Sequence, residues 1–191
     1  MINIDAGGNC MVYVFLANGF EELEALAPVD ILRRAKVNVK TVGVSGMNVT
    51  SSHGVAVTAD ISADELILND DLEMIVLPGG MPGTLNLEAS EIVQRSVDFC
   101  ADNDRYIAAI CAAPSILGHK GLLKGKKATS FPKFNSELEG ANVVDDLVAV
   151  DGKIITAKGA GASVEFGLTL VQLLVSKETS DSIKTSIQCK V

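Results

Sequence analysis

The sequence predicts an α/β fold in which helices pack on both faces of a mostly parallel β-sheet, giving three layers. Short apolar runs alternate along the chain with stretches of helical periodicity, which is the pattern of repeated β-α-β units. Nearly half of the 191 residues (48%) are hydrophobic and only 21% are charged, so the chain can bury a large core. The length fits one domain, and we therefore expect residues 1–191 to form a single domain.

The predicted elements of the first part of the chain begin with a strand over residues 11–17. A helix follows over residues 21–35, because apolar side chains recur there every three or four positions. Residues 37–44 form the second strand. Residues 48–59 alternate around a His-Gly pair and are typical of a β-hairpin that projects from the sheet.

The third strand, over residues 72–77, runs into a loop rich in glycine and proline over residues 78–83. Residues 106–110 are wholly apolar, so we expect this strand near the centre of the sheet. A helix begins directly after Cys111 and ends near Gly118. The remaining elements are a helix over residues 90–103, a strand over 127–130, strands within 147–158 joined by the turn Asp151-Gly152, and helices over 162–175 and 177–187.

Charge and hydropathy argue against nucleic-acid and membrane roles. The formal net charge is −8, and the longest basic runs are the pairs Arg33-Arg34 and Lys126-Lys127, which a phosphate backbone would not attract. Apolar runs fall short of the roughly 18 residues that cross a bilayer. Residues 1–10 lack the pattern of a signal peptide, and we expect them to form a flexible extension of a cytoplasmic protein.

The four cysteines, Cys10, Cys100, Cys111 and Cys189, show no CxxC spacing. With only two histidines in the chain, a metal centre is not expected, and the simplest prediction is reduced thiols and no cofactor. Cys100 fits the buried face of a helix, whereas Cys10 and Cys189 are expected to be exposed in the tails.

Cys111 is the candidate reactive residue because it lies between a strand and a helix, as in a nucleophile elbow. The sharp turn needs small neighbours, and Ala109, Ala112 and Ala113 are small. The helix amino terminus directs free N–H groups at the sulfur, which predicts a lowered thiol pKa. A buried, inert cysteine is the competing interpretation, and the local pattern supports the two equally.

Two other strand ends are expected to converge on Cys111. Glu24, in the first turn of the first helix, faces the packed side, so its carboxyl should tend to stay protonated and could donate to a thiolate. The backbone N–H groups of Gly79 and Gly80 could stabilise an oxyanion. Stabilisation of the helix end suffices to explain the neighbouring Glu22, whereas Glu24 differs in facing the packed side. A simple tight turn explains the glycines equally well.

Neither histidine is a convincing catalytic base. His119 follows Cys111 by eight residues, about two helical turns, and is expected at the end of that helix. His53 lies in the predicted hairpin turn and is more typical of a surface or interface residue. A conventional Cys-His protease is therefore not predicted.

Four motifs, in this order along the chain, strongly resemble the ThiJ/PfpI superfamily and, within it, the DJ-one branch named for the parkinsonism-associated protein deglycase. They cover residues 19–24 (Gly-Phe-Glu-Glu-Leu-Glu), 77–80 (Leu-Pro-Gly-Gly), 108–114 (Ala-Ala-Ile-Cys-Ala-Ala-Pro) and 158–166 (Lys-Gly-Ala-Gly-Ala-Ser-Val-Glu-Phe). The resemblance implies a flavodoxin-like sandwich and a homodimer. It makes Cys111 the oxidation-sensitive nucleophile and Glu24 its protonated partner. Gly80 and Ala112 would direct backbone N–H groups into the pocket.

The sequence departs from the family pattern at three positions. Phe131 takes the place of a frequent active-site histidine, as in bacterial members close to this branch, which excludes a Cys-His dyad. Ala160 replaces the proline of a Gly-Pro-Gly loop and so changes the pocket wall. His53 stands where many members carry arginine, which puts the family's interface ion pair with Glu21 in doubt.

The resemblance implies a cofactor-free glyoxalase or deglycase that acts on methylglyoxal, glyoxal or their early adducts through Cys111 and Glu24. Without the histidine we expect slow turnover. An oxidative-stress sensor with chaperone-like action, in which Cys111 becomes a sulfinate, is the alternative. A cysteine peptidase or amidase is the weakest reading, because distant members place a histidine directly after the cysteine and Ala112 stands there.

Overall fold

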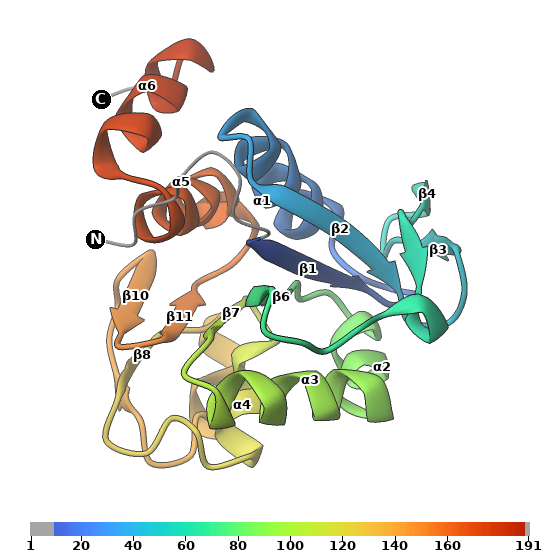
Figure 1. Ribbon diagram of the computed structural model, residues 1–191. Coiled ribbons are helices and arrows are strands. Elements are labelled where there is room, and N and C mark those ends of the chain that lie inside the picture. Colours follow the sequence, from blue (N-terminus) through green and yellow to red (C-terminus); the bar gives the residue numbers. More distant parts are fainter. Residues whose placement is uncertain (1–9, 190–191) are drawn as a thin grey trace.

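The computed structural model describes residues 10–189, and its core is a seven-stranded sheet in the order β10-β11-β7-β6-β1-β2-β5 (Figure 1). Every neighbouring pair is parallel except β10 and β11, so the sheet is mostly parallel, as expected. The strands are β1 (Met11–Leu16), β2 (Asn38–Gly43), β5 (Ile61–Ser62), β6 (Leu72–Leu77), β7 (Tyr106–Ile110), β10 (Val148–Asp151) and β11 (Ile154–Ala157). The expected flexible extension at residues 1–9 lies outside the described residues.

The order of the five central strands, β2-β1-β6-β7-β11, is the flavodoxin-like order, in which the order of strand addition reverses between β1 and β6. Ligands of such sheets bind beyond the carboxyl ends of the strands at this reversal. β7 lies in the interior of the sheet between β6 and β11, so its wholly apolar sequence is explained by burial on both faces.

Helices cover both faces of the sheet and complete the three-layer sandwich (Figure 1). One layer contains α1 (Glu22–Arg34), α5 (Ser163–Leu174) and α6 (Lys177–Ser186). The other contains α2 (Gly83–Glu88), α3 (Glu91–Asp102) and α4 (Pro114–His119). Alternate residues of β1 enter the two apolar layers, with Val14 facing α1 and α5, and Phe15 facing α3 and α4.

Some predicted elements are placed differently. The strand expected over residues 127–130 is only β8 (Lys127–Ala128), which pairs with β9 (Asn142–Val143) outside the main sheet. Helix α2 was not predicted, because its six residues follow a Gly- and Pro-rich loop and are too few to show helical periodicity. A 3-10 helix over Pro132–Glu137 also lacks a periodic signal.

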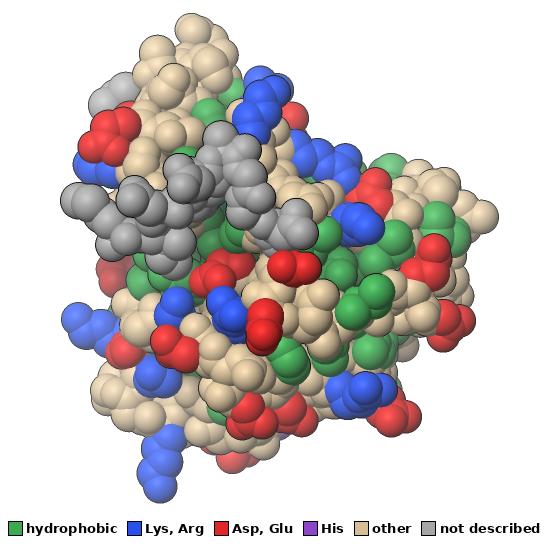
Figure 2. Space-filling model, viewed as in Figure 1, with side chains coloured by type: hydrophobic (Ala, Val, Ile, Leu, Met, Phe, Trp, Pro, Cys, Tyr) green, Lys and Arg blue, Asp and Glu red, His purple; other side chains and the backbone are tan. Residues whose placement is uncertain are grey.

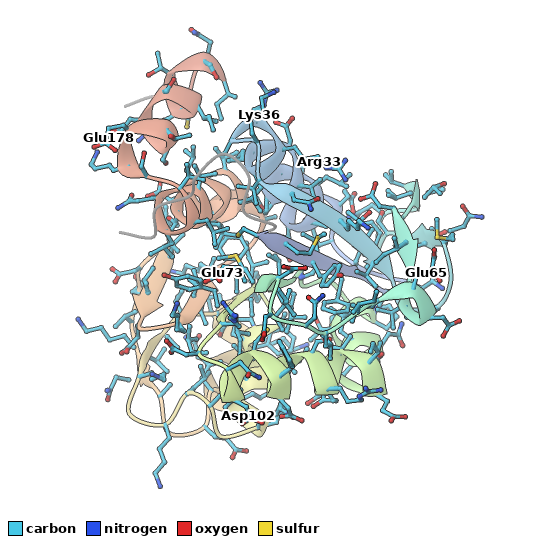
Figure 3. All side chains as sticks on the ribbon, in the orientation of Figure 1. Arg33, Lys36, Glu65, Glu73, Asp102 and Glu178 are labelled. Carbon is cyan, nitrogen blue, oxygen red and sulfur yellow. The ribbon has the colours of Figure 1, made fainter. Side chains whose placement is uncertain are left out.

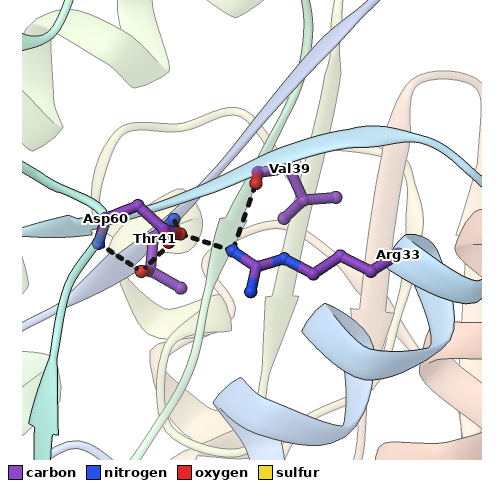
Figure 4. A network of polar contacts seen from close by, with 4 residues as sticks. All are labelled: Arg33, Val39, Thr41 and Asp60. Carbon is purple, nitrogen blue, oxygen red and sulfur yellow. Dashed lines mark hydrogen bonds and ion pairs between the residues drawn. The ribbon is translucent and has the colours of Figure 1, made fainter.

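The expected hairpin is formed by β3 (Asn48–Thr50) and β4 (Ala56–Thr58), and a polar network holds the chain that leaves it against the sheet edge (Figure 4). The Asp60 carboxylate accepts hydrogen bonds from the Thr41 N–H (2.7 Å) and hydroxyl (2.9 Å) and from Arg33 of α1 (2.5 Å). Arg33 also donates to the Val39 carbonyl (3.3 Å). Burial would raise the pKa of Asp60, but these donors hold it below its ordinary value.

Ion pairs connect several parts of the remaining surface. Figure 3 labels Glu73 at the amino-terminal end of β6, where its carboxylate contacts Arg105 (2.7 Å) and Lys153 (3.9 Å). On the face shown in Figure 2, basic and acidic side chains are interspersed. Within residues 10–189, every helix is too short or too polar to cross a membrane.

Replacing Asp60 by asparagine tests the network in Figure 4. We expect Asp60→Asn to lower the free energy of unfolding by about 1–2 kcal/mol, because the charged acceptor of three donors is lost. Since the folded pKa of Asp60 is depressed, its contribution is present at neutral pH and is lost as the pH falls below about 4. Urea unfolding at pH 7 and pH 3.5 measures both effects.

The matched control is Asp30→Asn, which removes the exposed pair of Asp30 and Arg34 on the same helix. Exposed pairs at this spacing contribute about 0.3–0.5 kcal/mol, so this variant should stay close to the wild type. Equal losses in the two variants would contradict the role given to Asp60.

Candidate active site

Three strand ends meet at the carboxyl edge of the sheet and bring together the predicted reactive residues. Glu24 lies in α1 after β1, Gly79 and Gly80 follow β6, and Cys111 follows β7. These are the strands on and beside the reversal point of the sheet, which is where an α/β sheet of this order binds ligands. The three segments were predicted from the sequence to converge, and the structure places them in contact.

Cys111 has a left-handed backbone conformation (φ 65°), which is strained for a residue other than glycine. Its N–H donates to the Ala157 carbonyl (2.8 Å), and its carbonyl accepts from the Phe131 N–H (2.9 Å). Hydrogen bonds to two neighbouring segments, the end of β11 and the backbone at Phe131, therefore hold the turn in place. The short side chains of Ala112 and Ala113 are buried, so the elbow leaves no space for larger residues.

Glu24 is a buried carboxyl, with 1% of its surface exposed. Its Oε2 accepts the Gly79 N–H (2.9 Å), and its carboxyl is hydrogen-bonded to the Cys111 thiol. Its position is fixed at the start of α1, where its own N–H donates to the Glu21 carboxylate (2.8 Å). The carboxyl is thus held directly against the sulfur.

Gly79 and Gly80 have different roles. The Gly79 N–H is used by Glu24, so it does not face an oxyanion as the sequence suggested. The N–H groups of Gly80 and Ala112 instead donate to the Cys111 sulfur. A Cβ on Gly79 would lie 2.6 Å from Glu24 Oε2 and 2.7 Å from Cys111 Cβ, so any side chain there would separate the pair.

The charge states of the pair follow from burial. Burial raises the pKa of the Glu24 carboxyl to about 7. Burial, followed by the negative charge of Glu24, raises the pKa of the Cys111 thiol to about 12, although the N–H groups of Ala112 and Gly80 lower it. The expectation that the helix end lowers the thiol pKa is therefore wrong in sign, because two N–H groups do not offset burial beside a carboxylate.

The two groups titrate as one unit because they are hydrogen-bonded. The pair loses one proton near pH 7 and the second near pH 12. Between these values one proton remains in the hydrogen bond, mostly on the sulfur because the thiol has the higher pKa, and the smaller fraction of molecules that carry it on Glu24 hold Cys111 as a thiolate. Glu24 is thus both the group that opposes the thiolate when charged and the donor that stabilises it when protonated.

The histidines lie elsewhere, as expected. His119 ends α4 and contacts the carboxylates of Glu88 (2.6 Å) and Glu137 (3.5 Å). The exposed His53 pairs with Glu22 (3.0 Å) rather than with Glu21, and this hydrogen bond raises the pKa of His53. Ligand atoms of Glu21, Glu22 and His53 lie within 4.8 Å of one another, and the ion pair accounts for their arrangement.

A cavity of about 450 Å³ adjoins the elbow and contains both predicted pocket-wall residues, Phe131 and Ala160. It also contains Leu147 and Lys158, which sequence reasoning did not select because nothing in a strand sequence tells which residues face a neighbouring loop. A second cavity, of about 490 Å³, lies near Arg105 at the amino ends of β7 and β11, at the edge of the sheet opposite Cys111.

The other cysteines are free thiols outside the site. Cys100 is buried in α3 as predicted, and burial raises its pKa to about 12. Cys10 was expected to be exposed but is half-buried, and burial raises its pKa to about 11. Cys189 is also partly buried rather than fully exposed.

Comparison with known proteins gives consistent matches over most of the chain. The model of the DJ-1/PfpI family matches residues 11–173. Protein DJ-1 homolog A of Arabidopsis thaliana is 37% identical over 91% of this chain, which spans only 45% of that longer relative. The glutathione-independent glyoxalase DJ-1 of Schizosaccharomyces pombe is 30% identical over 92% of this chain and 97% of its own length.

Solved structures agree with the sequence comparison. Oxidized Toxoplasma gondii DJ-1 superposes with a TM-score of 0.89 at 33% identity, over 94% of this chain and 98% of the other. The family model covers the three strand ends that carry Glu24, Gly80 and Cys111. The fold, the order of the motifs and the matched length together show that the chain belongs to the DJ-1/PfpI family.

Proposed function

We propose that the protein is a cofactor-free enzyme that converts reactive α-oxoaldehydes, such as methylglyoxal and glyoxal, or their early adducts, into hydroxy acids. The observation that carries this proposal is the hydrogen bond between the buried Glu24 carboxyl and the Cys111 thiol. It places a nucleophile and a proton donor with a pKa near 7 side by side, which is what addition to an aldehyde followed by proton transfer requires.

In the proposed reaction the Cys111 thiolate adds to the aldehyde carbon, and protonated Glu24 gives its proton to the new oxyanion. The resulting hemithioacetal carries a hydrogen on the same carbon. The Glu24 carboxylate removes it, the proton of the hemithioacetal hydroxyl passes to the neighbouring carbonyl oxygen, and Glu24 returns its proton to the neighbouring carbonyl carbon. This step oxidises the aldehyde carbon and reduces the ketone carbon of methylglyoxal, leaving a thioester of lactate. Water then cleaves the thioester and restores the thiol.

The presence of Phe131 beside Cys111 leads us to expect slow turnover. It donates its backbone N–H to Cys111, but its side chain cannot accept a proton, so water that attacks the thioester lacks a second base at this position. A positioned acid or base contributes about 10²–10⁴-fold to a rate. The Schizosaccharomyces pombe relative is named a glutathione-independent glyoxalase, which supports the class of reaction.

The second candidate function is peroxide sensing. The Cys111 thiolate would reduce one peroxide to give a sulfenic acid, and a second peroxide would give the sulfinic acid, with one water or hydroxide released each time. The N–H groups of Gly80 and Ala112 and the Glu24 carboxyl are donors that could hold the sulfinate oxygens. The Toxoplasma gondii neighbour was solved in an oxidized form, which favours this candidate. A peptidase is not supported, since both histidines pair with glutamates away from Cys111.

Lactate formation from methylglyoxal tests the enzymatic proposal. We expect wild-type protein to form lactate, Cys111→Ala to reduce it to the level without protein, and Glu24→Gln to reduce kcat by about 10²–10⁴-fold because the amide cannot take up a proton. Cys189→Ser, which alters a thiol outside the site, is the matched control and should retain the wild-type rate. Equal lactate from wild type and Cys111→Ala would end the proposal.

The pH dependence of Cys111 alkylation tests the shared proton. The rate should rise with a midpoint near pH 7, stay level to about pH 11 and rise again near pH 12, because the pair loses its protons in two steps. In Glu24→Gln the thiol titrates alone, so the rate should rise in one step. Iodoacetamide labelling of the Cys111 peptide, followed by mass spectrometry, gives the rates. A single wild-type step at the free-thiol value of about 8.5 would contradict the coupling.

Treatment with increasing amounts of hydrogen peroxide tests the peroxide-sensing function. If Cys111 is the sensor, it should reach the sulfinate before Cys10 or Cys189 is oxidised, because protonated Glu24 and the N–H groups of Gly80 and Ala112 can stabilise first its thiolate and then the sulfinate oxygens. Glu24→Gln should slow this selective oxidation. Peptide mass spectrometry measures each cysteine, and earlier oxidation of either tail cysteine would exclude the sensor role.

A further inference from the structure

The cavity of about 450 Å³ beside the elbow has a mostly apolar lining. Four glycine and alanine residues of the segment that leads into α5 line it, together with larger side chains. We call it the apolar subsite, and it consists of Phe131, Pro132, Leu147, Ala160 and Ala162 together with the adjoining glycines and Lys158.

The apolar subsite borders the backbone turn that carries Cys111, and Cys111 itself is not among its lining residues. Phe131 belongs to both, since its N–H donates to the Cys111 carbonyl (2.9 Å) while its ring lines the cavity. The same ring lies 3.5 Å from where a Cβ on Gly159 would be, so it packs against the loop after β11. That loop follows Ala157, whose carbonyl accepts the Cys111 N–H (2.8 Å). A molecule bound covalently to Cys111 therefore has this cavity as its neighbour.

The chemistry of the lining indicates an apolar occupant. Phe131 and Leu147, which line the cavity, leave 47% and 53% of their surface exposed, so both offer apolar area that an occupant would bury. The charged group at this cavity, Lys158, is paired with the Asp145 carboxylate and so does not present a free positive charge to an anion. The methyl group of methylglyoxal would fill only a small part of the volume, leaving these side chains wet.

We propose that the apolar subsite holds the carbon substituent of the α-oxoaldehyde, and that aryl and branched alkyl substituents are preferred to methyl. Phe131 is then a residue that determines specificity, in the position where a proton-accepting side chain would otherwise act. The part of this inference that concerns turnover rests on the proposed function.

For an aryl substrate such as phenylglyoxal the reaction is balanced without a further reactant besides water. The aldehyde carbon is oxidised to the carboxylate, the ketone carbon is reduced to the alcohol, and one water is consumed to give mandelate. The bond formed to Cys111 in the first step is broken in the last.

Alkylation with paired maleimides tests the cavity without requiring turnover. The rates at which N-phenylmaleimide and N-methylmaleimide modify Cys111 are measured by peptide mass spectrometry, and their ratio is divided by the same ratio for glutathione. We expect the normalised ratio to be about tenfold above one, because the phenyl ring is buried in the apolar subsite.

Leu147→Ser should lower the ratio toward that of glutathione, and the exposure of Leu147 makes a polar replacement compatible with folding. Val150→Ser is the matched control, since Val150 is also exposed but lies on β10 outside the cavity. The inference is overturned if the wild-type ratio equals that of glutathione. It is also overturned if the ratio in Leu147→Ser stays as high as the ratio in Val150→Ser.

A second experiment compares kcat/KM for phenylglyoxal and methylglyoxal as substrates, with mandelate and lactate as the measured products. A larger value for phenylglyoxal that falls in Leu147→Ser supports the preference, and a larger value for methylglyoxal overturns it. Because the maleimide ratio needs only the thiol and the cavity, absence of both products together with a raised ratio counts against the proposed function alone.

Discussion

A carboxyl and a thiol that share a proton in a buried site impose the constraint on which the rest of the carboxyl edge depends. Glu24 is buried and Cys111 is partly buried, and burial raises the pKa of each. Such a pair is stable only where fixed donors replace the lost water. Gly79 supplies one to the carboxyl, and Gly80 and Ala112 supply two to the sulfur. Because backbone N–H groups must approach this closely, position 79 has no space for a side chain.

The scaffold positions these donors by ordering parallel strands side by side. The pair spans β1 and β7, and β6 lies between them, so the loop after β6 is the one that reaches both groups. Strain at Cys111 (φ 65°) is held by hydrogen bonds to Ala157 and Phe131 on the other side. At the amino edge the strands end in a different way, with Glu73 neutralised by Arg105 and Lys153. The amino edge of the sheet thus carries structural ion pairs, and the carboxyl edge carries the titratable site.

Patterns in the sequence predicted the sheet, its helices and the convergence of Glu24, Gly80 and Cys111, because apolar runs and small residues at strand ends reflect burial and close approach directly. They did not predict α2 or the ladder of β8 with β9, which are short and depend on tertiary contacts. The raised pKa of Cys111 was also missed, since a helix end can be read from a sequence but the depth of burial cannot. Leu147 was missed for the same reason, as its exposure depends on a loop that is distant in sequence.

The two candidate functions use the shared proton in opposite ways. Turnover of an α-oxoaldehyde requires Glu24 to release and recover its proton in each cycle, for which a pKa near 7 is well matched to neutral conditions. A sulfinate at Cys111 is a permanent anion, so it keeps Glu24 protonated and stops that cycle. Under the proposed function, oxidation would therefore also be inactivation, and the two reactions compete for one thiolate. Occupation of the apolar subsite by a bound substrate would crowd the approach to the sulfur next to Phe131, and so favour turnover over oxidation while carbonyl substrate is present.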